Sequence, residues 1–191
     1  MLRTGRKWFA ASVLAALLAL PGGAWGAGFD YGKFNQEVGL RFGYGKSTQK
    51  ARVHLYSLLP HWGIFLLKPG QRYGLGLSFV VEGIVSIAEA ERNGFELGFT
   101  PMLKLHLPLG TAAKFFIEGG AGLITESFDS PAIAHAFNFT PQVGGGFDIA
   151  LMPQLGLTLA YRFRHSSNAG LYAENPAFNC HFFHGGLTYF Y

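Results

Sequence analysis

The feature that most constrains this chain is an alternation of polar and apolar residues that recurs in segments of about ten from Glu37 to the C-terminus. In the stretch EVGLRFGYG, one parity is apolar and the other is charged or small: Val38, Leu40, Phe42 and Tyr44 against Glu37, Gly39, Arg41 and Gly43. Side chains of a β-strand point alternately to opposite faces, so a period of two predicts strands. Turn signals separate eight such segments: 37–45, 52–59, 75–87, 94–107, 114–125, 136–151, 154–166 and 181–191.

Alternation alone leaves two architectures open. Several segments carry a charge in mid-strand: Glu82, Glu96, Lys104, Glu118, Asp148 and Arg162. In a soluble sandwich or lipocalin-like barrel the polar face meets water, whereas in a small membrane barrel the apolar face meets lipid and the polar face fills the lumen. The even strand count favours the membrane barrel. The alternating aromatic end, Leu187, Tyr189 and Tyr191, favours it too, because it resembles the assembly signal of bacterial outer-membrane proteins.

The N-terminal segment predicts export. Arg3, Arg6 and Lys7 precede an apolar run over residues 8–20 and then a stretch of small residues, the layout of a secretory signal. The run is shorter than the roughly 20 residues that a spanning helix needs. We therefore expect a cleaved signal peptide over residues 1–26 and one β-barrel domain over residues 27–191.

The composition argues against a nucleic-acid-binding surface, an internal disulfide and a glycine-rich phosphate loop. With three of the 15 basic residues in the signal, 12 remain against 11 acidic residues, so no basic surface for nucleic acid is expected. The single cysteine, Cys180, cannot form an internal disulfide. The glycine runs EGGAG and VGGGF lack phosphate-loop spacing, and their expected use is steric, in a narrow and curved barrel.

Parity of crossings gives an expected orientation. If both termini are periplasmic, the seventh strand, 154–167, ends at the outer leaflet and residues 168–180 form an extracellular loop. Residues 60–74 are too long and too apolar for a tight periplasmic turn, and we expect them to extend the second and third strands.

The end of the seventh strand departs from the apolar pattern. Its lipid-facing parity runs through leucine and aromatic residues and then ends in His165 and Ser167. An unpaired polar group costs free energy on leaving water, and residues i and i+2 lie close enough for a base to activate a hydroxyl nucleophile. The alternative is an interfacial histidine followed by the ordinary turn sequence SSNAG.

The stretch HSSNAGLYAENPAFN, residues 165–179, resembles the signature of the PagL family of lipid A 3-O-deacylases, H-x-S-N-A followed by N-P-G-x-E. His165, Ser167, Asn168 and Ala169 match the first block, and Asn175 and Pro176 match the second. The resemblance implies a serine esterase whose site lies on the outside of an outer-membrane barrel. Ser167 would be the nucleophile, His165 the general base and Asn168 a helper of the oxyanion.

The third catalytic position departs from the family pattern. Asn179 stands where the family has glutamate, and Ala177 replaces the preceding glycine. Exchanging the acid of a triad for its amide costs about 10⁴ in rate in a serine protease, although asparagine orients the histidine of papain-like enzymes. Counting back from Tyr191 in steps of two places Asn179 on the face of His165. Glu174 is the alternative third residue, if its loop folds back.

The sequence therefore predicts a bacterial outer-membrane esterase that removes the 3-hydroxyacyl chain at position 3 of lipid A, with its site facing the outer leaflet. The expected partners are lipopolysaccharide and membrane lipid, the expected state is a monomer or homodimer, and no cofactor or metal is expected. The alternative is a barrel of impaired or no catalytic activity that binds lipopolysaccharide or has a structural role. An acyl-transferring or phospholipid-cleaving barrel is a third possibility.

Overall fold

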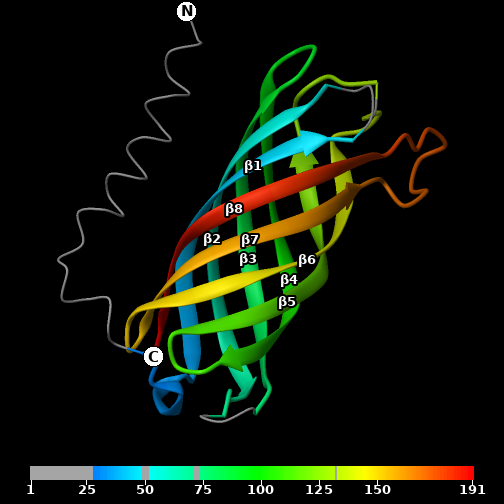
Figure 1. Ribbon diagram of the computed structural model, residues 1–191. Helices are drawn as coiled ribbons and strands as arrows, with labels where there is room; N and C mark the ends of the chain where they lie inside the picture. Colours follow the sequence, from blue (N-terminus) through cyan, green and yellow to red (C-terminus); the bar gives the residue numbers. More distant parts are fainter. Residues whose placement is uncertain (1–27, 49–51, 71–73, 132) are drawn as a thin grey trace, which may run out of the picture.

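The chain forms a closed antiparallel β-barrel (Figure 1). The computed structural model describes residues 28–48, 52–70, 74–131 and 133–191, so the expected signal peptide lies outside the described residues. A short 3₁₀ helix, η1 (Tyr31–Lys33), precedes eight strands: β1 (Gln36–Ser47), β2 (His54–Leu67), β3 (Gly76–Glu89), β4 (Gly94–Leu109), β5 (Ala113–Glu126), β6 (Phe137–Met152), β7 (Leu155–Ser166) and β8 (Phe178–Phe190). Neighbours in sequence are neighbours in the barrel, and β1 pairs with β8 to close it. The predicted fold class is confirmed.

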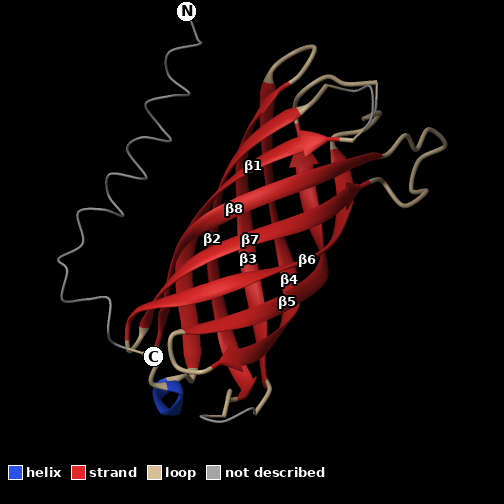
Figure 2. Cartoon of the chain, in the orientation of Figure 1, coloured by secondary structure: helices blue, strands red, loops and turns tan. Residues whose placement is uncertain are grey.

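The two ends of the barrel differ (Figure 2). The C-terminus and η1 lie at one end, which we call the terminal end. The connections β1–β2, β3–β4, β5–β6 and β7–β8 lie at the other, the loop end. No helix among the described residues is long and apolar enough to cross a membrane.

Alternating residues face inward and outward as the pattern predicts. On β7 the even positions Thr158, Arg162, Arg164 and Ser166 are buried in the lumen, while Leu159 and Tyr161 are exposed on the outside. Large apolar side chains are exposed along the outer face of every strand. The outside of this barrel is therefore suited to a lipid environment.

Paired charges fill the middle of the lumen. The guanidinium of Arg162 binds the carboxylates of Glu82 and Glu118, and Arg41 binds Glu118 at 3.2 Å. Nearer the terminal end, Asp148 accepts a bond from Lys114 and lies 3.5 Å from Lys104. All these side chains are buried, and burial of charges is tolerated because each has a partner of opposite sign.

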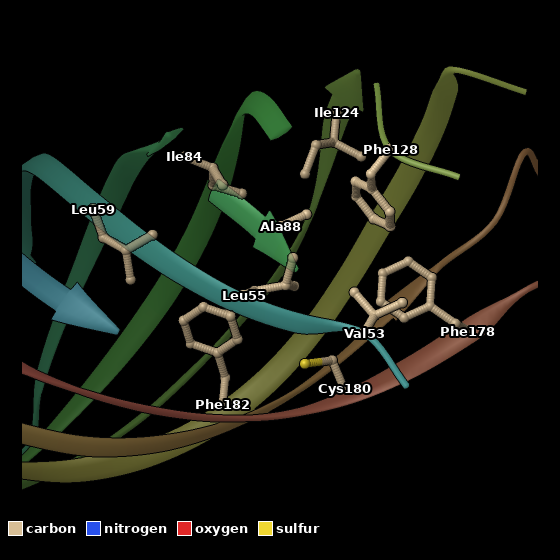
Figure 3. Packing of buried hydrophobic residues seen from close by; sticks show 10 residues of the cluster. All are labelled: Val53, Leu55, Leu59, Ile84, Ala88, Ile124, Phe128, Phe178, Cys180 and Phe182. Carbon is tan, nitrogen blue, oxygen red and sulfur yellow. The ribbon is translucent and has the colours of Figure 1, made fainter. Parts of the chain in front are cut away.

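Apolar clusters close both ends of the lumen. At the loop end, ten residues from several strands and two connections pack together (Figure 3): Val53, Leu55, Leu59, Ile84, Ala88, Ile124, Phe128, Phe178, Cys180 and Phe182. At the terminal end, Phe29, Tyr31 and Phe34 pack on Phe190. The Tyr31 hydroxyl donates to Gly110 O at 2.9 Å, and burial, helped by the charge of Asp148, raises the pKa of Tyr31 to about 12.

The glycine runs have the predicted steric use. A Cβ at Gly144 would lie 2.8 Å from Arg162 Cα and closer still to Tyr161 O. A Cβ at Gly186, which lies outside these two runs, would lie 2.6 Å from Arg41 Cα. Both glycines thus make room for strands that carry the large arginines of the lumen.

The strand boundaries agree with the sequence-based expectation at one place and differ from it at two. Residues 60–67 of the apolar stretch belong to β2, as the expected extension required, whereas β3 begins only at Gly76 and is not extended. The connection after β7 is shorter than residues 168–180, because β8 begins at Phe178 and not near His181. Pairing with β7 extends β8 by these residues, and this brings Asn179 into the sheet.

Candidate active site

Ser167 lies one residue beyond β7, yet its backbone is held on the sheet. Its N–H donates to Phe139 O at 3.1 Å, and its carbonyl accepts from Phe139 N–H at 2.7 Å. Phe139 belongs to β6, so the chain leaves the barrel only after Ser167. The serine is therefore placed by secondary-structure bonds and not by a free loop.

His165 faces Asn179 across the β7–β8 pair. The two residues are direct partners in the strand register, and His165 Nδ1 lies 2.7 Å from Asn179 Oδ1. Both side chains are half-buried on the outer face of the barrel. With the amide oxygen as acceptor, Nδ1 carries the ring proton and Nε2 is left as the base.

Ser167 lies next to His165 on the same outer face, because the two residues are two positions apart in an extended chain, with Ser166 between them. Among the described residues, Ser167 Oγ makes no hydrogen bond, to His165 or to any other group. A catalytic hydrogen bond is often long before substrate binds and shortens in the complex.

Asn168 holds the loop that follows. Its Oδ1 accepts from Gly170 N–H at 2.9 Å, its Nδ2 donates to Glu174 O at 2.8 Å, and its carbonyl accepts from Leu171 N–H at 3.1 Å. The two central residues of this turn, Ala169 and Gly170, have φ of 54° and 81°, as in a type I′ turn. Asn168, the predicted oxyanion residue, is buried, and its side-chain amide points into the loop.

The two candidates for the third catalytic residue, Glu174 and Asn179, lie in different places. Glu174 lies in the loop and is exposed, and within the described parts of the chain its carboxylate makes no hydrogen bond or ion pair. Its link to the site is the backbone bond from Asn168. Asn179, in contrast, contacts the His165 imidazole directly.

Sequence reasoning gave Asn175 no role, although it matches the second block of the motif. Its Oδ1 accepts the backbone N–H of Asn168 at 3.0 Å, although the side chain is exposed. Asn168 and Asn175 together therefore bind the start of the loop to its end. The match to the motif was the only signal in the sequence that pointed to this residue.

Buried charges on the inner face fix the strand that carries the site. Arg164 binds Glu96 through two bonds of 2.6 and 3.2 Å, and Ser166 donates to Glu126 at 3.3 Å. Both residues flank His165 in sequence but point into the lumen. This anchoring limits how far the end of β7 can move.

His181 lies on the outer face near the site but bonds elsewhere. It pairs with Phe163 in the register, and its Nδ1 lies 2.5 Å from the Tyr161 hydroxyl. No serine or threonine hydroxyl is bonded to it in the described part of the chain. The described residues also hold no group of three or more metal-ligating side chains.

The arrangement can perform nucleophilic chemistry. It offers a hydroxyl, an imidazole two residues away and an acceptor that fixes the imidazole tautomer. The site opens onto the apolar outer face and not into the lumen, which is filled. A substrate would therefore have to approach along the outside of the barrel.

Comparisons with known proteins identify the family and the fold. A family model described as lipid A 3-O-deacylase (PagL) matches residues 61–188. Compared sequence against sequence, the chain matches no curated protein.

Solved structures share the fold. The crystal structure of the outer membrane enzyme PagL superposes with a TM-score of 0.65 at 20% identity, covering 78% of this chain and 97% of that one. The crystal structure of Neisserial surface protein A (NspA) superposes with a TM-score of 0.55 at 10% identity, covering 82% of this chain and 97% of that one. With two thirds of its length matched by the family model, and with His165 and Ser167 on the outer face of an eight-stranded barrel, the chain belongs to the PagL family.

Proposed function

We propose that the protein is a serine esterase of the bacterial outer membrane that removes the 3-hydroxyacyl chain at position 3 of lipid A. The observation that carries the proposal is the bond of 2.7 Å between His165 Nδ1 and Asn179 Oδ1, beside Ser167 on the outer face. Membership of the PagL family supports the reaction class and the membrane. No cofactor takes part in the proposed chemistry.

The reaction runs in two steps. In the first, His165 Nε2 takes the Ser167 proton as Oγ bonds to the ester carbonyl carbon. The bond from that carbon to the sugar oxygen then breaks, and His165 returns the proton to the sugar oxygen. In the second, His165 takes a proton from water as the water oxygen bonds to the carbonyl carbon of the acyl-serine. The bond from that carbon to Ser167 Oγ then breaks, and His165 returns the proton to Oγ, which releases the fatty acid and free Ser167.

Asn179 sets the tautomer that this chemistry needs. With its oxygen toward Nδ1, it keeps Nε2 unprotonated, as the acid of a triad does. It carries no charge, however, so it stabilises the imidazolium less than a carboxylate would. An amide can also turn its NH₂ toward the ring, which a carboxylate cannot do.

Asn168 contributes to the oxyanion site through the loop that it orders. Both polar atoms of its side chain hold loop backbone, and this fixes the turn directly after Ser167. Backbone N–H groups of such a turn are suitable donors for a developing oxyanion. We assign this role to the N–H of Ala169, two residues after the nucleophile.

The substrate fits the geometry of the outer face. We place the loop end at the cell surface and both termini in the periplasm, so Ser167 lies at the level where lipid A joins its sugars to its acyl chains. The apolar outer face of β6 and β7 would hold the acyl chain.

The test is mass spectrometry of lipid A from cells that express the wild type or Ser167→Ala. Heat-modifiable gel mobility confirms that both are folded in the outer membrane. Loss of one 3-hydroxyacyl group with the wild type only is the expected result. Unchanged lipid A in both would favour a non-catalytic barrel that binds lipopolysaccharide, and a different Ser167-dependent product would point to acyl transfer or phospholipid cleavage.

A further inference from the structure

An aromatic stack bridges two loops beside the site. The rings of Tyr172, in the β7–β8 loop, and His135, in the β5–β6 loop, lie with their centroids 3.9 Å apart and an interplanar angle of 26°. Tyr172 nevertheless keeps 44% of its surface exposed. The catalytic chemistry uses neither residue.

Both rings are tied to the immediate surroundings of Ser167. The turn over residues 168–171 directly follows Ser167 and reverses the chain, so Tyr172 begins the returning limb of the loop. On the other side, Asn138 Nδ2 donates to His135 O at 2.8 Å. Asn138 precedes Phe139, whose backbone pairs with Ser167.

The stack lies on the loop-end side of Ser167, opposite to the acyl-binding face. Toward the terminal end, β6 presents Val143 and Phe147 on the outside, both exposed and apolar. An ester held at Ser167 with its acyl chain on that face must direct its alcohol portion toward the loops. That alcohol portion is a sugar if the proposed function is correct.

We propose that Tyr172, supported by His135, is the subsite that holds the glucosamine bearing the scissile ester. A pyranose ring has faces of C–H groups that pack on aromatic rings, and polar edges that suit a tyrosine hydroxyl and an imidazole. Beyond His135, a hollow of about 440 Å³ continues along the β5–β6 loop. The ion pair of Arg92 and Asp129, at 3.0 Å, contributes to its lining, so a polar headgroup can extend in this direction.

This inference rests on the proposed esterase, and its consequence is selectivity for a glycolipid. The experiment compares two substrates in detergent micelles: lipid A, and a p-nitrophenyl 3-hydroxyacyl ester that lacks the sugar. Tyr172→Ala is expected to raise KM for lipid A by about three- to tenfold. With the sugar-free ester, Tyr172→Ala should raise KM no more than the control variant does. Tyr172→Phe should restore most of the affinity for lipid A.

The matched control is Tyr44→Ala. Tyr44 also stacks on a histidine, His54, with ring centroids 5.9 Å apart, but it belongs to β1 and lies away from Ser167. Equal losses on both substrates with Tyr172→Ala would mean that the stack only shapes the loop, and would overturn the proposal. An unchanged KM for lipid A would overturn it as well.

A binding measurement separates the inference from the proposed catalysis. Titration calorimetry of lipid A in micelles is done with Ser167→Ala and with the Ser167→Ala, Tyr172→Ala double variant. Weaker binding by the double variant supports the sugar subsite even if the wild type hydrolyses neither substrate. Equal binding by the two variants contradicts it even if the wild type is an active deacylase.

Discussion

At the scale of single residues, the site differs from its family at the group that contacts the histidine. Asn179 occupies the position of the family glutamate and makes the contact with His165 that a triad acid would make. Asn179 differs from a glutamate in two ways: it carries no charge, and its amide can present either an oxygen or an NH₂ group to the imidazole. In the proposed esterase, Asn179 would therefore affect the rate more than the geometry of the site.

The first prediction concerns this position. Asn179→Glu is expected to raise turnover on lipid A, because a carboxylate stabilises the imidazolium and holds one tautomer. The increase in turnover can approach about 10⁴, which is the factor that a serine protease loses when the acid of its triad is changed to the amide. Initial rates of purified variants give the measurement.

Two further variants at position 179 show which property of the glutamate changes the rate. Asn179→Asp keeps the shape of the side chain while adding the charge, and Asn179→Leu removes the acceptor and should lower the rate. An unchanged or lower rate with both Glu and Asp would mean that the asparagine is no handicap in this enzyme.

At the scale of elements, the β7–β8 loop is ordered by two asparagines whose bonds are local. Asn168 binds Gly170 and Glu174, and Asn175 binds Asn168, so the loop closes on itself within eight residues. The strand ends supply the rest of the order through the bonds between Phe139 and Ser167. A loop built this way can hold backbone N–H groups in place without metal or disulfide.

We expect Asn168→Ala to lower kcat about 10- to 100-fold with little change in KM. Loss of its bonds costs on the order of 1–3 kcal/mol of local order, and that order positions the oxyanion donor. Asn168→Asp retains the bond from Gly170 but not the donation to Glu174, and should lie between. The measurement is steady-state kinetics on lipid A.

Asn93→Ala is the control for this loop, since Asn93 accepts a similar backbone bond, from Ala90 N–H at 3.2 Å, in the β3–β4 loop. If Asn168→Ala and Asn93→Ala were equally active, Asn168 would have no part in catalysis.

At the scale of the whole molecule, a lumen filled with paired charges holds the barrel rigid behind the site. Glu118 bonds to both Arg41 and Arg162, and Glu82 lies within ion-pair distance of the same two arginines. Arg164 extends the paired charges to the strand end that carries His165. The buried ion pairs and the proposed catalytic residues thus lie on opposite faces of the same strand.

Glu118→Gln is expected to lower the free energy of unfolding by about 3–5 kcal/mol, because it leaves two buried guanidiniums short of charge. Urea unfolding in lipid vesicles, followed by gel mobility, measures the change. Activity per folded molecule should stay the same. Glu91→Gln, at an exposed loop position, is the control, and equal stability of the two variants would contradict the role of the pair network.

The sequence by itself determined the strands, their inner and outer faces, and the exterior position of His165 and Ser167. The physical reason is that the period of two is a local property of an extended chain, readable from residues next to one another. The polar end of the seventh strand indicated His165 and Ser167, the motif added Asn168 and Asn179, and Glu174 was the alternative third residue because it lies in the same loop.

Only the tertiary structure decided which of these residues meet. The contact of Asn179 with His165 depends on the register of β8 against β7 and on β8 starting at Phe178, and hydrogen bonds between strands set both. The inward orientation of Asn168 and the stack of Tyr172 on His135 depend on loop closure. The motif and the count from Tyr191 placed Asn179 on the face of His165. The bond between the two side chains, the bonds of Asn168 and the stack of Tyr172 on His135 join residues whose separation in sequence carries no periodic signal.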